Sequence, residues 1–92
     1  MRLDRFLWFA RFAKTRAVAQ AMVVAGHIRL SGRRVERAAT TVRPGDTLTF
    51  AQGGEVRAIR ILALPARRGP APEAQACYAN AAANDSQQVG SD

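Results

Sequence analysis

The residues best suited to chemistry gather at the start of a predicted helix. Lys14 and Arg16 carry long cationic donors and Gln20 carries an amide, and Arg16 and Gln20 share one helix face because they are four residues apart. A helix N-terminus also offers free backbone N–H groups and the positive end of the helix dipole. These groups together can hold a phosphate. The alternative at this point is an ordinary solvated start of a charged helix.

The charge distribution favours the phosphate interpretation. Residues 1–37 contain nine basic and two acidic residues, whereas residues 38–92 contain five of each, so the whole net charge of +7 lies in the first part of the chain. Thirteen of the fourteen cations are arginine, which binds phosphate through two parallel hydrogen bonds and stacks on bases. Such a concentrated basic patch is typical of nucleic-acid binding.

Further candidate contacts are expected around this site once the helices pack against the first strand. The main set is Arg2, Arg11, Lys14, Thr15, Arg16, Gln20 and Arg29, and the weaker set is Arg5, His27, Arg33 and Arg34. Arg33 and Arg34 either extend the patch or only solubilise a hairpin. Arg16→Ala is expected to weaken nucleic-acid binding without changing the melting temperature.

Two helices must position these side chains. Leu3, Phe6, Leu7 and Ala10 recur at i, i+3, i+4 and i+7, which predicts a helix over residues 3–12 with one face in the core. Asp4 is expected to cap the first free N–H groups of this helix. Thr15 is a favourable N-cap for the second helix, and Gly26 is a suitable residue to end it. Trp8, Phe9 and Phe12 lie away from the core face, so they either stack on bases or pack under the C-terminal segment.

The remaining chain predicts a small antiparallel sheet. Ile28, Leu30 and Val35 flank Ser31-Gly32 as in a hairpin, and Gly53-Gly54 joins an alternating strand over 47–50 to a last strand over 56–64. Pro72 is expected to begin a helix that runs to about Ala83. The predicted fold is α+β: a single small domain over 1–65, a connector and C-terminal helix over 66–83, and a disordered tail over 84–92.

The motifs resemble the S4 RNA-binding domain. The resemblance rests on Arg2-Leu3-Asp4, on Lys14-Thr15-Arg16 with Ala17 and Ala19, and on the run from Gly26 to Gly32. Leu7-Trp8, Ala10-Arg11-Phe12, Pro44-Gly45-Asp46 and Arg67-Arg68 extend it over roughly residues 2–80 and are most similar to the fifteen-kilodalton heat-shock protein family. The resemblance implies a two-helix and hairpin fold, no cofactor, and structured RNA as the partner.

Catalysis and metal binding have little support in the sequence. Glu36, Asp46 and Glu55 share no spacing suited to paired carboxylates, and Cys77 and His27 are each the only residue of their type. Cys77 is expected to be a small apolar residue on the last helix. No enzyme activity, metal, small-molecule substrate or membrane partner is therefore expected, and the chain is expected to be cytoplasmic and monomeric.

The family resemblance implies a specific role for the basic surface. The implied role is to bind the ribosomal RNA of a large ribosomal subunit that still carries peptidyl-tRNA. This binding would help to rescue or recycle stalled subunits under heat stress. The alternatives are an S4-like cofactor of nascent-chain tailing and a generic binder of structured RNA or DNA. Relatives can carry a longer basic C-terminal tail, which is missing from this sequence and leaves any contact by that tail in doubt.

Overall fold

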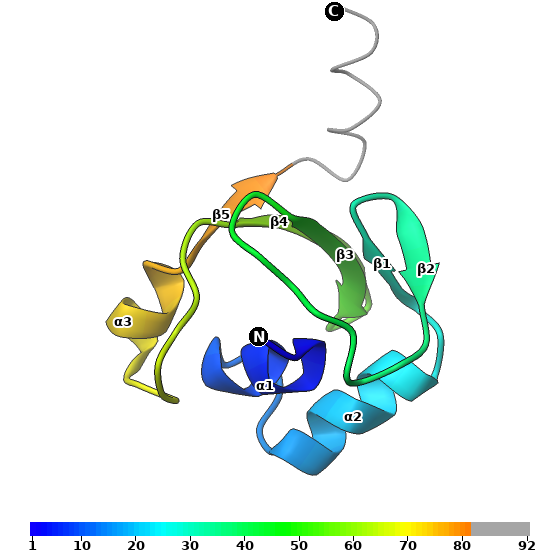
Figure 1. The fold of residues 1–92 in the computed structure, drawn as a ribbon, viewed down its shortest axis with the longest axis horizontal. Helices are drawn as coiled ribbons and strands as arrows, with labels where there is room; N and C mark the ends of the chain where they lie inside the picture. The colour runs from blue at the N-terminus through cyan, green and yellow to red at the C-terminus, as the bar shows by residue number, and fades with distance from the viewer. Residues whose placement is uncertain (82–92) are drawn as a thin grey trace, which may run out of the picture.

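The computed structural model describes residues 1–81, which form three helices and one antiparallel sheet of five strands (Figure 1). The helices are α1 (Leu3–Phe9), α2 (Arg16–Val24) and α3 (Ala71–Gln75). The strands are β1 (Ile28–Leu30), β2 (Arg33–Val35), β3 (Thr47–Gln52), β4 (Glu55–Ile61) and β5 (Tyr78–Ala81), in the spatial order β2-β1-β3-β4-β5. The predicted α+β class, with two N-terminal helices on a hairpin-based sheet and a C-terminal helix, is confirmed.

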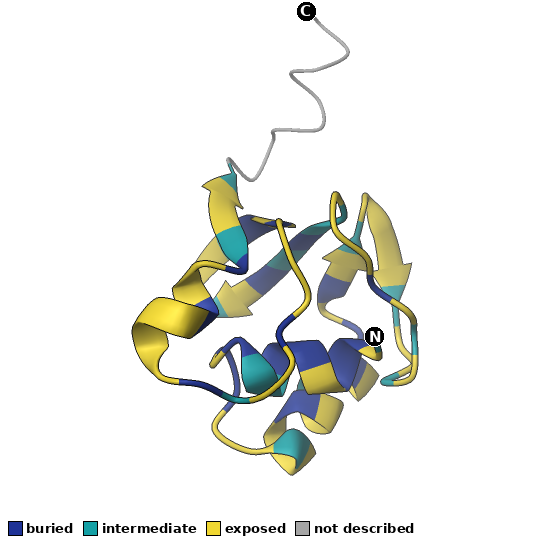
Figure 2. Ribbon diagram, turned by 60° about the vertical axis from the view of Figure 1, so that its left-hand side comes forward, coloured by how far each residue is buried: buried dark blue, intermediate teal, exposed yellow. Residues whose placement is uncertain are grey.

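The core lies between α1, α2 and the inner strands. The predicted inward residues of α1 are all buried, and they meet Val23 of α2, Ile28 of β1 and the buried residues of β3 and β4. Figure 2 shows this as buried segments on α1 and along the strands, while the outer parts of the helices are exposed. The fold therefore presents the basic residues of both helices to solvent on a fixed apolar support.

Helix α1 starts against a loop rather than under a side-chain cap. The backbone N–H groups of Leu3 and Asp4 donate to the carbonyl oxygens of Thr40 (2.8 Å) and Ala38 (3.1 Å). The Thr40 hydroxyl holds that loop in shape by donating to the Arg37 carbonyl at 2.7 Å. Two of the N–H groups that a helix leaves unpaired are thus satisfied by the chain between β2 and β3.

Helix α1 ends three residues earlier than the apolar period predicted. Arg11 adopts a left-handed backbone conformation (φ 68°), and the N–H groups of Arg11 and Phe12 donate back to the carbonyls of Trp8 (3.1 Å) and Leu7 (2.9 Å). This is the Schellman pattern of helix termination, which normally uses glycine at the left-handed position. Sequence rules did not predict this early end of the helix, because arginine occupies that position.

Helix α2 and the two tight hairpins agree with the sequence predictions. The Thr15 hydroxyl accepts a hydrogen bond from the Val18 N–H at 3.1 Å, and Gly26 follows the helix with φ 79°. Ser31 and Gly32 both have positive φ (49° and 87°), as expected in a two-residue hairpin turn. Arg29 is exposed and Ile28 is buried, which confirms the predicted alternation along β1.

The C-terminal part of the domain differs from the prediction. The helix begins near Pro72 but ends at Gln75, and Tyr78–Ala81 form β5, which pairs with β4. Cys77 therefore follows the helix, where its thiol is nearly buried; burial raises the pKa of that thiol, and the charge of Glu73 adds to the effect. A helix to Ala83 is wrong because the open edge of β4 offers backbone partners to residues 78–81. The expected tail over 84–92 lies outside the described residues.

The aromatic residues of the first helical segment differ in burial, and Phe12 takes the predicted place under the C-terminal segment. Phe12 is buried, and its ring centroid lies 5.1 Å from that of Phe50 and 4.7 Å from that of Tyr78. The C-terminal strand therefore packs on Phe12. Trp8 and Phe9 remain half-buried, with ring centroids 5.3 Å apart.

Candidate nucleic-acid interface

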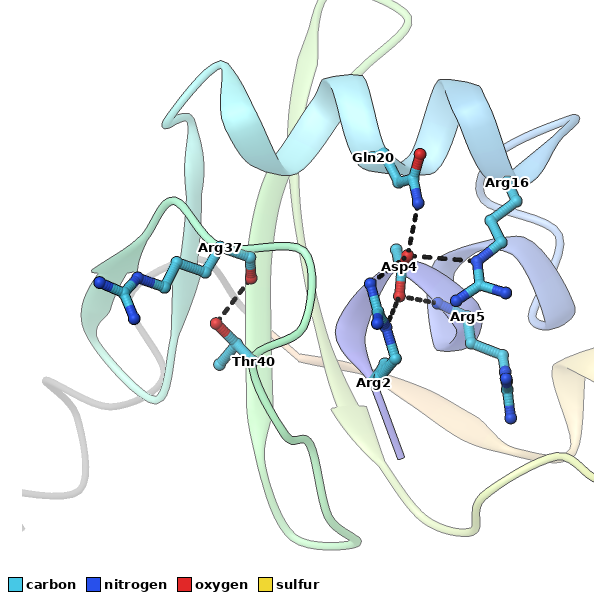
Figure 3. Close-up of polar contacts among 7 residues, drawn as sticks. All are labelled: Arg2, Asp4, Arg5, Arg16, Gln20, Arg37 and Thr40. Carbon is cyan, nitrogen blue, oxygen red and sulfur yellow. Dashed lines mark hydrogen bonds and ion pairs between the residues drawn. The ribbon is translucent and has the colours of Figure 1, made fainter.

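A buried carboxylate organises the first part of the candidate interface. The Asp4 side chain has no exposed area, although it lies on the first turn of α1. Its two oxygens accept hydrogen bonds from Arg2 Nε (3.1 Å) and Nη2 (3.2 Å), Arg16 Nε (3.3 Å), Gln20 Nε2 (3.1 Å) and the Arg5 backbone N–H (2.8 Å) (Figure 3). The predicted capping role is thus only one of five contacts, and Asp4 mainly joins α1 to α2.

The hydrogen bonds keep Asp4 ionised in spite of its burial. Burial alone would raise the pKa of this carboxyl, but the donors from Arg2, Gln20, Arg16 and the Arg5 backbone outweigh it and lower the pKa from 3.8 to about 2. A carboxylate that accepts several strong donors is stabilised in its charged form. At neutral pH the cluster therefore contains two guanidinium cations and one carboxylate.

Asp4 also fixes the direction of the two guanidinium groups. The side chains of Arg2 and Arg16 retain 44% and 36% exposure, so each binds Asp4 through one edge and still reaches solvent. Lys14 is exposed just before the helix. The predicted trio of Lys14, Arg16 and Gln20 is only partly joined in the structure. Arg16 and Gln20 both donate to Asp4, whereas Lys14 has no hydrogen-bond or ion-pair partner within residues 1–81.

The first hairpin provides a second group of cations. Arg29 of β1 lies directly opposite Arg34 of β2, and the two line a hollow of about 330 Å³ together with Gly26 and His27. Neither arginine has a hydrogen-bond or ion-pair partner in the described part of the chain. Like charges on opposed strand positions destabilise a hairpin slightly. An anion in this hollow would remove that repulsion.

Glycine suits the position beside this hollow because of its left-handed backbone conformation, and the Arg34 side chain packs closely against it. Gly26 has φ 79°, and a Cβ atom there would lie 2.6 Å from Arg34 Nη2. The guanidinium of Arg34 thus rests against the turn that links α2 to β1. The sequence indicated the helix stop at Gly26, but it did not indicate that Arg34 packs there.

Similarity to known proteins is consistent with this arrangement. The family model described as the S4 domain matches residues 1–48. A heat shock protein 15 homolog from Haemophilus influenzae is 42% identical over 78 residues, which are 85% of this chain and 59% of the relative. The trimeric structure of heat shock protein 15 from Vibrio cholerae matches with a TM-score of 0.84 and 35% identity, covering 99% of this chain and 91% of that one.

The chain belongs to the heat shock protein 15 family of S4-domain proteins. It spans about three fifths of the length of the Haemophilus influenzae relative. The small ribosomal subunit protein uS4 of Phytoplasma australiense is also similar, with 41% identity over 49 residues, which cover 53% of this chain and 25% of that protein. The similarity to uS4 lies in the S4 domain alone.

The other predicted site residues lie in separate parts of the fold and not in one cluster. Thr15 lies at the α2 N-terminus, where its hydroxyl is used as the cap, and Arg5 contributes only its backbone N–H to the Asp4 cluster. Arg33 is exposed at the hairpin end of β2. Arg11 lies at the far end of α1 and donates from Nη1 to the Gly69 carbonyl at 2.9 Å. The structure thus groups Arg2, Arg16 and Gln20, and separately Arg29, Arg34 and His27.

Residues 1–81 contain no group of three or more His, Cys, Asp or Glu side chains arranged to hold a metal ion. Within the same range, no helix is both long enough and apolar enough to cross a membrane.

Proposed function

We propose that this S4-domain protein binds structured RNA through α1, α2 and the first hairpin. The observation that carries the proposal is the Asp4 cluster, in which one buried carboxylate holds Arg2, Arg16 and Gln20 with their free edges toward solvent. Held donors lose less conformational freedom when they bind a phosphate than free side chains do. The cluster therefore favours recognition of a fixed arrangement of phosphates.

The exposed cations would supply the remaining affinity. Lys14, Arg29 and Arg34 have no counter-ion within residues 1–81, so binding to RNA requires no internal ion pair to break. Each phosphate that they neutralise releases a counter-ion, which makes the affinity depend on salt concentration. The Asp4 cluster would thus contribute recognition of RNA shape. The free cations would contribute long-range electrostatic attraction.

We propose that the specific partner is ribosomal RNA of the large subunit. The protein would bind this RNA while the subunit still carries peptidyl-tRNA, and would thereby act in rescue or recycling of stalled subunits under heat stress. Support comes from membership in the heat shock protein 15 family and from similarity to a ribosomal protein. Cofactor activity in nascent-chain tailing and general binding of RNA or DNA are the competing outcomes. We propose a cytoplasmic location for the same reason.

Co-sedimentation with separated ribosomal subunits tests this proposal. The wild-type protein should sediment with large subunits that carry peptidyl-tRNA in preference to empty large subunits and small subunits. Lys14→Gln should weaken binding and lower the slope of log affinity against log salt by about one unit. Arg43→Gln is the matched control, since it also removes one positive charge but from the exposed turn before β3.

Three results of this experiment would contradict the proposal. Equal, salt-sensitive binding to every RNA and to DNA would leave only a generic binder. A preference for large subunits engaged in tailing would favour the tailing alternative. Equal losses for Lys14→Gln and Arg43→Gln would place the interface elsewhere.

We also propose that one copy of the chain forms the interface. Every residue of the Asp4 cluster and of the hairpin hollow comes from a single chain. The Vibrio cholerae relative was solved as a trimer. Light scattering should therefore give a mass near 10.0 kDa for this chain. A mass about three times larger would show that this chain forms a trimer, as the Vibrio cholerae relative does, and would contradict the proposal of a single copy.

A further inference from the structure

A second cationic hollow lies at the other end of α1. It has a volume of about 250 Å³ and is formed by the end of α1, the β3–β4 hairpin, α3 and β5. Its polar lining consists of Arg11, Gln52, Arg57, Gln75 and Tyr78, beside the ring of Phe12. Among residues 1–81, no Asp or Glu lines it, so its described lining carries two positive charges without a negative one.

Arg57 is held in place entirely by neutral groups. Its guanidinium donates to Gln52 Oε1 and to Asn80 Oδ1, each at 2.9 Å, and lies 5.2 Å from the ring centroid of Phe12 and 6.0 Å from that of Tyr78. These contacts fix its direction but leave its charge uncompensated, since the described residues give it no acidic partner. A half-buried, fixed cation of this kind attracts an anion more strongly than a mobile surface arginine.

Other lining groups are available for hydrogen bonding. The Gln75 amide and the Tyr78 hydroxyl make no hydrogen bond within residues 1–81, and Arg11 uses only Nη1, on the Gly69 carbonyl. The acid of α3, Glu73, is bound by Arg67 and lines a different hollow. The hollow therefore combines two cations with unused amide and hydroxyl groups, as a site for a phosphorylated and polar ligand would.

We propose that this hollow binds one nucleotide of the RNA, with its phosphate between Arg11 and Arg57 and its base edge at Gln75 and Tyr78. The inference rests on the proposed RNA-binding function. Asp4 and Ala10 are six residues apart, which is about 9 Å along α1. The hollow and the Asp4 cluster therefore lie near opposite ends of one short helix, so a single RNA strand could contact both.

Gln75→Glu tests the site without removing a contact. Gln75 is exposed at the end of α3 and has no hydrogen-bond partner in the described chain, so the change adds a negative charge to the hollow and little else. Ala76→Glu is the matched control, because it adds the same charge at the next exposed residue, which does not line the hollow. Gln75→Glu should weaken binding of a short single-stranded RNA about fivefold, and Ala76→Glu less than about twofold.

Nuclear magnetic resonance would locate the contact. Addition of the RNA should shift the side-chain signals of Gln52, Gln75 and Arg57 as well as those of the Asp4 cluster. Inorganic phosphate and adenosine monophosphate are used in separate titrations to distinguish a free anion from RNA. Perturbation of the hollow by these small anions but not by RNA would overturn the assignment to RNA.

The two proposals fail in different ways. If RNA shifts the signals of the Asp4 cluster and leaves the hollow unchanged, or if Gln75→Glu and Ala76→Glu weaken binding equally, the second site is refuted while the RNA-binding proposal stands. If the wild-type protein binds no RNA, the proposed function is refuted, and the nucleotide assignment fails with it.

Discussion

Asp4→Asn should destabilise the domain because it removes the one charge that joins Arg2 and Arg16. An asparagine in the same position keeps the size of the side chain, but it has a single acceptor oxygen, and its NH2 group would face the donors that now bind Oδ1 or Oδ2. The buried site then contains two cations and no carboxylate. Removing one partner of a buried ion pair leaves the other charge uncompensated.

The pKa gives the size of this effect. A fall from 3.8 to about 2 means that ionised Asp4 stabilises the fold by about 2 kcal/mol at neutral pH. For a domain of this size, a loss of about 2 kcal/mol lowers the melting temperature by about 8 to 16 °C. Because the folded-state pKa is depressed, the contribution is complete above about pH 5, decreases as the pH falls below 3.8, and is lost as the pH falls through about 2.

Denaturant unfolding of both proteins from pH 7 down to pH 2.5 measures this difference. The free-energy difference should be constant above about pH 5 and should fall to about half its value near pH 3. Asp46→Asn is the control, since Asp46 accepts only two hydrogen bonds from residues 1–81, from the Arg43 N–H (2.9 Å) and the Ser31 hydroxyl (3.3 Å). A difference below about 0.5 kcal/mol at pH 7, or one that does not decrease in acid, would refute the argument.

Four further substitutions test the roles of Arg16, Lys14 and Arg11. Arg16→Ala should weaken RNA binding and also lower the free energy of unfolding by about 1 kcal/mol, because Asp4 loses one donor. The loss is limited because solvent partly screens this half-exposed ion pair. Lys14→Ala should weaken RNA binding without changing the stability. Thermal melting and RNA titration of both variants check this, and equal melting temperatures would show that the Arg16 contact contributes nothing. Arg11→Gly should change the free energy of unfolding by less than about 1 kcal/mol, since relief of the left-handed backbone strain offsets the lost hydrogen bond to the Gly69 carbonyl. Arg11→Ala should be clearly less stable than Arg11→Gly, because alanine keeps the strain and also loses that hydrogen bond. Calorimetry compares the two variants, and the reverse order would contradict the strain argument.

The expectation for Arg16 changed once its partner was known. From the sequence, Arg16 is a surface residue whose removal should leave melting unaffected. In the structure, its Nε lies 3.3 Å from Asp4 Oδ2, twelve residues earlier in the chain. Helical spacing cannot reveal such a contact, because it depends on how α1 and α2 pack and not on the period of either helix.

Local rules predicted the elements wherever one strong signal determined the local structure. The buried face of α1, the Thr15 cap, the Gly26 stop and the Ser31-Gly32 turn each follow from a residue type with a specific conformational preference. The end of α1 was predicted too late because Arg11 takes a conformation that usually needs glycine. The C-terminal helix was predicted too long because its last residues pair with β4, a partner distant in sequence.

The same reasoning explains why the second hollow was not predicted. Residues 38–92 have no net charge, so the sequence suggested no anion site there. In the fold, the acids among residues 38–81 do not line the hollow, whereas Arg57 of β4 and Arg11, which follows α1, both line it. A charge sum over a segment averages residues that the tertiary structure separates.

The domain holds its cations in two different ways, and each way has a consequence for binding. Arg2 and Arg16 are bound to a buried carboxylate, which reduces the net charge of the cluster by one but fixes the direction of both guanidinium groups. Arg29 and Arg34 lie opposite each other without a counter-ion among residues 1–81, which retains their full charge at a small cost to the hairpin. Salt should therefore weaken contacts made by the hairpin more than it weakens the arrangement around Asp4, since exposed charges are screened more than buried ones.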